Sequence, residues 1–135
     1  MSTAAPTTAA GGFPADLVRL LTEIGYFAAG SGRTAQALAI MEGLKAMRPG
    51  RSAAYIGIAL AHMNAGRPAE AARVLREEAL PAVAPDEADA ARVFLALALH
   101  LDGRPRECAE ALDLVPADSA DADAVKLAKT LREAL

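Results

Sequence analysis

The feature that most constrains the fold of this chain is a short segment that occurs three times at nearly constant spacing. The sequences SGRTAQALAIM, AGRPAEAARVL and DGRPRECAEAL share a Gly-Arg pair followed by small and apolar residues. Gly32 and Gly66 are 34 residues apart, and Gly66 and Gly103 are 37 residues apart. A period of this length is typical of stacked helical hairpins, in which each repeat is one helix–turn–helix unit.

Apolar residues recur at helical spacing on both sides of each Gly-Arg pair. Before Gly32 the pattern is formed by Leu17, Leu20, Leu21, Ile24, Phe27 and Ala28. A glycine just past the end of a helix accepts the left-handed conformation that stops the helix. Thr34, Pro68 and Pro105 then stand where a second helix can begin, and a proline there loses no needed N–H. Each repeat is therefore predicted to be two helices joined at the glycine.

Small residues occupy equivalent positions in all three repeats, which indicates close packing between helices. Hydrophobic residues make up 53% of the chain and aromatic residues only 4%, and much of the hydrophobic share is alanine. Alanine suits close-packed helices better than a β-sandwich. The equivalent small residues are Gly25, Ala59 and Ala96 in the first helices, and Ala37, Ala71 and Cys108 in the second helices.

The pattern resembles the tetratricopeptide repeat, a helix–turn–helix unit, over about residues 18–115. The resemblance rests on a large apolar residue followed by a small one in mid-helix, as in Ile24-Gly25, Ile58-Ala59 and Leu95-Ala96, and on Pro49 at a repeat end. The usual aromatic residues are replaced by Ala28, Met41 and His62. The resemblance implies repeats at about 18–51, 52–85 and 89–117.

The expected fold is an all-α, right-handed α-solenoid of three helix–turn–helix repeats closed by a C-terminal capping helix. Residues 14–135 are expected to form this single domain, after a disordered tail at 1–13. The capping helix is placed at about 119–135, with Asp118 or Ser119 as its N-cap. Between the second and third repeats, Pro81 and Pro85 are expected to lengthen the connection within residues 77–88.

No combination of residues points to catalysis, a metal or a cofactor. Cys108 replaces alanine at a packing position, and His62 and His100 have no carboxylate at ligand spacing. The Gly-Arg-Pro turns lack the pattern of a phosphate-binding loop. The net charge of −3 and the absence of a basic run argue against nucleic acid. No signal peptide or membrane span is recognisable, so no membrane association and a cytoplasmic location are expected.

The resemblance implies that the first helices line a concave groove that binds a protein or peptide. The alternative is that some of these side chains belong to the core or are covered by the N-terminal tail. The residues expected to line the groove are Thr22, Tyr26, Ile56, Leu60, Met63, Asn64, Val93, Leu97, His100 and Leu101.

The groove lacks the basic residues with which some tetratricopeptide proteins bind a terminal carboxylate, because those places hold Thr22, Tyr26, Ala90 and Phe94. The segment EGLKAMRPGRSAAYIGIALAHMNAGRPAEAARVLRE is instead similar to the small tetratricopeptide chaperones of bacterial type III secretion. That likeness implies a chaperone that holds the amphipathic helix of a secretion or needle subunit. The alternative is a scaffold or adaptor that assembles a multiprotein complex. A second small co-chaperone or a homodimer remains open.

Overall fold

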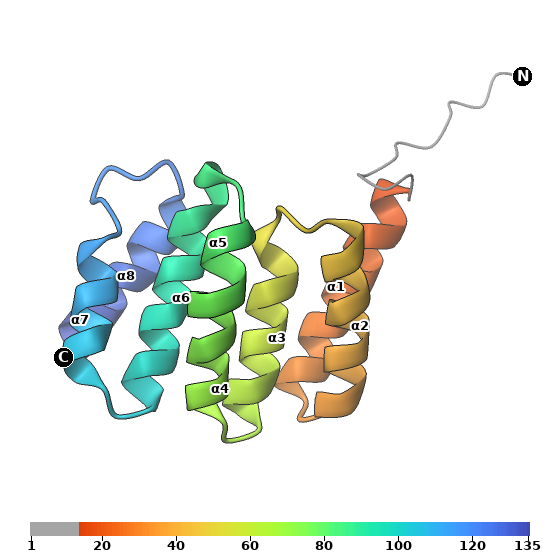
Figure 1. Cartoon of the computed structure of the whole chain (residues 1–135), viewed down its shortest axis with the longest axis horizontal. Helices are drawn as coiled ribbons and strands as arrows, with labels where there is room; N and C mark the ends of the chain where they lie inside the picture. The colour runs from red at the N-terminus through yellow and green to blue at the C-terminus, as the bar shows by residue number, and fades with distance from the viewer. Residues whose placement is uncertain (1–13) are drawn as a thin grey trace, which may run out of the picture.

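The computed structural model describes residues 14–135, which form a row of helices (Figure 1). With α4, the π-helical turn η1 and α5 taken as one continuous helix, these residues make seven helices and no strand. The predicted all-α solenoid is therefore confirmed, whereas the predicted tail at 1–13 lies outside the described residues. The elements are α1 (Ala15–Gly30), α2 (Thr34–Met47), α3 (Ser52–Asn64), α4 (Pro68–Arg73), η1 (Val74–Ala79), α5 (Leu80–Ala82), η2 (Pro85–Glu87, a 3-10 turn), α6 (Ala88–Leu101), α7 (Pro105–Asp113) and α8 (Ala122–Ala134).

The helices pack as three hairpins that stack on one another along the long axis of the molecule. Helix α1 pairs with α2, α3 with α4, and α6 with α7. The hairpins then stack through contacts of α3 with α1 and α2, and of α6 with α3 and α4. Figure 1 shows α1 and α2 at one end of this row and α7 and α8 at the other. Each short helix is thus stabilised by its neighbours rather than by its own propensity.

The three Gly-Arg turns have the same backbone geometry. Gly32, Gly66 and Gly103 have φ angles of 77°, 78° and 71°, in the left-handed region that a side chain disfavours. In each turn the N–H of the following arginine donates to a carbonyl five residues earlier, at 2.8 to 2.9 Å. This hydrogen bond satisfies a carbonyl that the end of the helix leaves without a partner. The predicted role of the glycines as helix stops is therefore confirmed.

The core lies between the hairpins and is built largely from alanine with a few larger side chains. The predicted packing positions Ala37, Ala71 and Cys108 have no exposed surface. Met41 is also fully buried, and its side chain lies against Gly25 and Gly57. A Cβ at either glycine would collide with the side chain of this methionine. The absence of a side chain on these glycines therefore lets Met41 fill the place of the usual aromatic residue.

The extra residues between the second and third repeats lengthen a helix, not the loop that was expected. The helix that begins at Pro68 continues through η1 to Ala82, with Pro81 inside its last turn. Within η1 the N–H of Leu80 donates to the carbonyl of Leu75, five residues earlier. In a regular α-helix the ring of Pro81 would press on the carbonyl four residues before it. We attribute the continued helix to this wider turn, which relieves that clash.

The N-cap of the last helix is Asp121, and the prediction of Asp118 or Ser119 was wrong. One carboxylate oxygen of Asp121 accepts from the backbone N–H of Ala124 at 3.0 Å. Ser119 is held in the preceding loop because its hydroxyl donates to Asp89 at 2.6 Å. Near the other end of α8, the Arg132 side chain donates to the carbonyl of Leu112 at 2.8 Å. These bonds fix α8 across the last hairpin, where it covers α6 and α7.

Candidate protein-binding surface

An apolar hollow of about 300 Å³ lies on the face formed by the first helices of the three hairpins. Its wall comes from α1, α3 and α6 alone, so the three repeats contribute to it together. A concave apolar site with few polar groups is the usual form of a ligand or peptide site. We call this hollow the first-helix groove. It is lined by Tyr26, Ala29, Gly30, Leu60, Met63, Asn64, Leu97 and Leu101.

Six of the ten residues expected at the groove lie in its wall, and the other four do not. Ile56 and Val93 are 6% and 1% exposed, so their assignment to the groove was wrong and they belong to the core. Both are one helical turn from groove residues, and Val93 instead lines a neighbouring hollow between α6 and α8. Thr22 borders a separate small hollow, where its hydroxyl donates to the carbonyl of Val18 at 2.7 Å. His100 is half-buried and stands outside the groove lining.

Beyond the six predicted residues, the groove lining contains Ala29 and Gly30. Gly30 ends α1 and adds only backbone to the wall. The apolar pattern cannot identify such a position, because a glycine carries no side chain to count. Asn64 links this backbone to α3, since its side-chain amide donates to the carbonyl of Ala29 at 2.9 Å. That bond satisfies a carbonyl in the last turn of α1 and holds the two helices at a fixed separation.

Tyr26 fixes the other side of the groove through a partly buried hydrogen bond. Its hydroxyl donates to the carbonyl of Ala53 at 2.6 Å, from α1 to α3. Burial, together with the negative charge of Glu87, raises the pKa of Tyr26 to about 12. The phenol therefore remains a neutral donor throughout the physiological range. The Tyr26 hydroxyl and the Asn64 amide nitrogen are thus engaged within the protein, and the apolar side chains are left for a partner.

Replacing Tyr26 with Phe is expected to lower the free energy of unfolding by roughly 0.5–1.5 kcal/mol at neutral pH, because one hydrogen bond is lost. The folded protein holds the Tyr26 proton more tightly than the unfolded chain. The stability from this residue is therefore complete below pH 10 and is lost as the pH rises toward about 12. Urea unfolding at several pH values checks this: the difference between wild type and Tyr26→Phe should shrink across that window. A difference that stays constant to pH 12 would contradict the burial of the phenol that raises its pKa.

A second hollow, of about 330 Å³, extends the apolar surface along the same face of α6. Leu97 and Leu101 line the first-helix groove, and Ala90 and Phe94 line the second hollow. These four positions follow i, i+4, i+7 and i+11 spacing, which places them on one side of the helix. Across from them, α8 contributes Leu127. Among the residues that line the two hollows, the charged ones are Asp121 and Asp123, at the second hollow.

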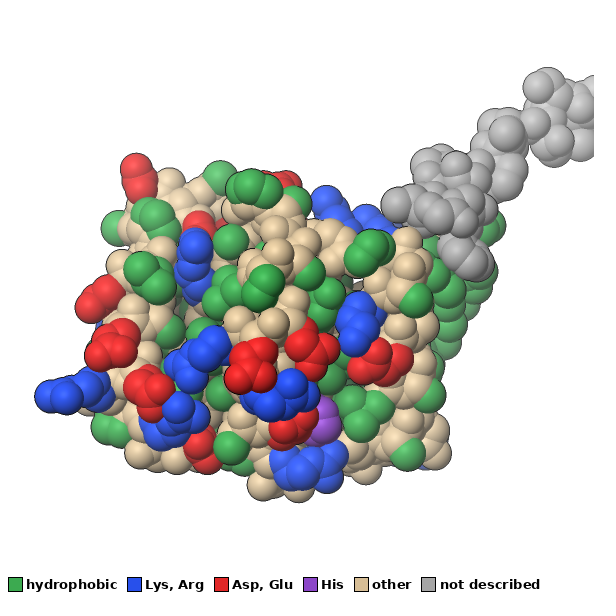
Figure 2. Space-filling view, viewed as in Figure 1, with side chains coloured by type: hydrophobic (Ala, Val, Ile, Leu, Met, Phe, Trp, Pro, Cys, Tyr) green, Lys and Arg blue, Asp and Glu red, His purple; other side chains and the backbone are tan. Residues whose placement is uncertain are grey.

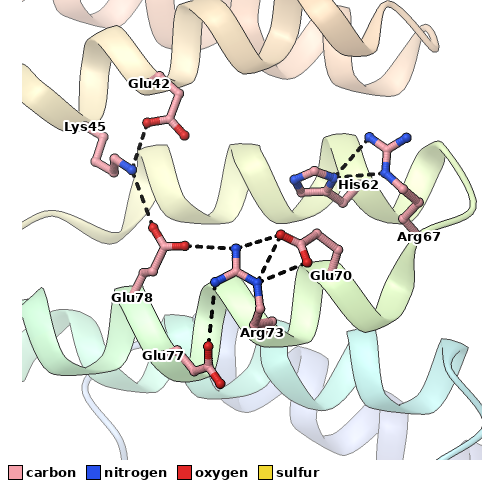
Figure 3. Close-up of polar contacts among 8 residues, drawn as sticks. All are labelled: Glu42, Lys45, His62, Arg67, Glu70, Arg73, Glu77 and Glu78. Atoms are coloured by element: carbon pink, nitrogen blue, oxygen red, sulfur yellow. Dashed lines mark hydrogen bonds and ion pairs between the residues drawn. The ribbon is translucent and has the colours of Figure 1, made fainter.

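The face formed by the second helices is charged, and its charges pair with one another. Figure 2 shows Lys and Arg side chains interspersed with Asp and Glu over α4 and α7. Between α2 and η1 the ammonium of Lys45 lies 2.8 Å from Glu42 and 3.5 Å from Glu78 (Figure 3). The Arg73 guanidinium lies 2.6 Å from Glu70 and 3.1 Å from Glu78. Because these ion pairs are satisfied internally, the apolar first-helix face is the better candidate for binding.

Cys108 and His62, which could have taken part in catalysis, lie in surroundings that do not favour it. Cys108 is fully buried, and burial raises the pKa of its thiol, which makes it a poor nucleophile. Burial and the charge of Arg67 lower the pKa of His62, whose Nδ1 accepts a hydrogen bond from Arg67. Within residues 14–135, no three His, Cys, Asp or Glu side chains lie close enough together to hold a metal ion.

Comparison with known families identifies the repeat that this geometry represents. One family model of the tetratricopeptide repeat matches residues 28–90, and a second matches residues 90–113. The chain is a tetratricopeptide-repeat protein. Such repeats are modules for protein–protein interaction and typically have no catalytic activity. No curated protein and no solved structure matches the chain. None of the helices in the described part of the chain is both long and apolar enough to cross a bilayer.

Proposed function

We propose that this tetratricopeptide protein binds the apolar face of an amphipathic helix in the first-helix groove. The observation that supports this most directly is the hollow of about 300 Å³ shared by α1, α3 and α6. Leu60, Met63, Leu97 and Leu101 give it an apolar wall, and Met63 adds a side chain that adapts its shape to a ligand. An amphipathic helix laid in such a groove places side chains at i, i+3, i+4 and i+7 against it.

The second hollow adds negative charge at one end of the proposed binding surface, which would set the direction of a bound helix. The segment bound there meets the carboxylates of Asp121 and Asp123, and neither forms an ion pair within residues 14–135. A partner helix with a basic residue at one end would place that residue beside these carboxylates. Its apolar residues would then continue along α6 into the first-helix groove. Complementary charge of this kind fixes the orientation of a partner more than it adds to affinity.

We further propose that the protein is a chaperone of bacterial type III secretion, as its resemblance to the small tetratricopeptide chaperones implies. Its client would be a secretion or needle subunit that polymerises through an amphipathic helix. Burying that helix in the groove removes the apolar surface that drives polymerisation, at roughly 25 cal/mol per Å². The second candidate function is a scaffold that assembles a multiprotein complex, which the protein-binding repeats support equally.

Co-expression with subunits encoded by neighbouring genes distinguishes the two functions. For a chaperone we expect one subunit to co-purify in a 1:1 complex and to stay monomeric, as measured by sedimentation, while the same subunit alone forms polymers. A scaffold would instead bind two or more folded proteins together and leave their polymerisation unchanged. A subunit that polymerises at the same rate with and without this protein contradicts the chaperone proposal.

A further inference from the structure

One face of α1 exposes a stripe of large apolar side chains outside the groove. Leu17, Leu20, Ile24 and Phe27 are 41%, 53%, 44% and 70% exposed. They follow one another at intervals of three, four and three residues, the spacing of the apolar seam in a coiled coil. Figure 2 shows hydrophobic side chains along the edge of the molecule at the α1 end. We call these four residues the α1 stripe.

The positions equivalent to the α1 stripe are buried in the other two repeats. Leu20, Ile24 and Phe27 correspond to Ala54, Ile58 and Ala61 in α3, and to Ala91, Leu95 and Ala98 in α6. Those six residues are at most 5% exposed. Through this face α3 packs on the first hairpin, where Ala61 is buried in one cluster with Ala28, Ala29 and Ala37. Helix α6 likewise packs on α3 and α4. The α1 stripe is therefore a packing surface that nothing covers within residues 14–135.

The size of the side chains shows what kind of surface would fit the stripe. Between repeats, alanine at the equivalent positions lets the helices stack closely. Leu20 and Phe27 are much larger and would hold a stacked hairpin away. Large side chains at three-four-three spacing instead suit a single facing helix that carries the same seam. The segment 1–13 offers only Met1 and Phe13 as large apolar residues, which are too few to cover four.

The two ends of the row do not complement each other, which favours a symmetric contact. At the far end, the outward side of α8 carries the exposed side chains of Lys126, Lys129 and Glu133. An apolar stripe gains little against such a surface, so head-to-tail stacking is disfavoured. A contact that uses the same patch on both molecules closes after two copies. Beside the stripe, Arg19 and Glu23 form an ion pair with each other at 3.6 Å and add little net charge to such a contact.

We propose that the α1 stripe pairs with the α1 stripe of a second copy of this chain, with the two helices antiparallel. In this arrangement Leu20 packs against Ile24 of the second copy, and Leu17 packs against Phe27 of the second copy. This order keeps the two Phe27 side chains apart, so the helix separation is more even than in a parallel pair. Antiparallel helix dipoles also attract. Tyr26 and Ala29 lie on the opposite side of α1, so the first-helix groove stays open in the dimer. The proposal is independent of the chaperone function.

Sedimentation equilibrium of the full chain, from low micromolar to near-millimolar concentration, tests the dimer. We expect the wild-type mass to rise from one chain to two, and Ile24→Glu to remain a single chain throughout with an unchanged helical circular dichroism spectrum. Leu114→Glu is the matched control, because Leu114 is 63% exposed on the last hairpin and should leave the dimer intact. A wild-type protein that stays monomeric, or a control that dissociates as Ile24→Glu does, overturns the proposal.

Cysteine cross-linking tests the antiparallel orientation. The native Cys108 is fully buried and gives little background, as the wild-type protein will show. A mixture of Leu17→Cys and Phe27→Cys chains should cross-link with a short bis-maleimide, whereas Phe27→Cys alone should not. Efficient cross-linking of Phe27→Cys alone would overturn the antiparallel pairing, because it places the two Phe27 positions side by side.

Discussion

Replacing Leu97 with Asp is expected to weaken binding of the partner helix by roughly a thousandfold while the protein still folds. Leu97 lies in the first-helix groove, close to the point where it meets the second hollow. The centre of an interface usually carries most of its binding energy. A carboxylate there would be buried without a partner in the complex, at a cost of several kcal/mol. In the free protein it would face the open hollow and remain hydrated.

The experiment pairs two measurements on each variant: thermal melting of the protein alone, and co-purification with the client. Leu60→Asp should behave as Leu97→Asp does, because Leu60 lines the same groove from α3. Leu114→Asp is the control for an exposed apolar residue elsewhere, and it should keep full binding. Variants that melt early would show that these leucines belong to the core. Variants that fold and still bind the client would place the binding site on another surface.

Replacing Gly57 with Ala is expected to destabilise the protein, although alanine is the better helix former. A Cβ at this position would lie against the Cγ, Sδ and Cε atoms of Met41, closer than real Cβ atoms approach their neighbours. Met41 is fully buried and has little room to move. Overpacking of this kind typically costs roughly 1–3 kcal/mol, which exceeds the gain of about 1 kcal/mol in helix propensity. Urea unfolding would measure the net loss.

Gly43 provides the matched control for this substitution. It also lies within a helix, α2, but it is exposed and a Cβ there would meet nothing within 4 Å. Gly43→Ala should therefore stabilise the protein by roughly 0.5–1 kcal/mol. Combining Gly57→Ala with Met41→Ala should cost less than the sum of the two single substitutions, because the collision is removed. A Gly57→Ala variant as stable as Gly43→Ala would contradict the packing of Met41.

The sequence alone was sufficient for those parts of the fold that depend on neighbours a few residues away. Gly32, Gly66 and Gly103 stop helices through bonds that reach back only five residues. The second helices begin at Thr34, Pro68 and Pro105, as predicted, because capping and proline geometry are also local. The 34-residue spacing then identifies the stacked repeat without any knowledge of a contact.

Where several residues could cap or stop a helix, only the folded structure determined which of them does so. Asp118, Ser119 and Asp121 are all good N-cap residues. The Ser119 hydroxyl donates to Asp89 on another helix, so it does not cap α8, and Asp121 does. The proline at position 81 predicts the end of a helix, but the π-helical turn before it allows the helix to continue to Ala82. Neither outcome follows from sequence, because each depends on what the neighbouring repeat offers.

Which apolar face of a helix is covered was likewise decided by the tertiary structure. Leu20, Ile24 and Phe27 have the same helical spacing as their counterparts in α3, and periodicity predicts burial for both. In the fold, α3 has a hairpin packed against that face, whereas within the described residues α1 exposes it. Ile56 and Val93 show the converse, since they were expected at the surface of the groove and are buried. A hydrophobic pattern specifies a face that favours burial, but only the arrangement of the repeats decides what lies against it.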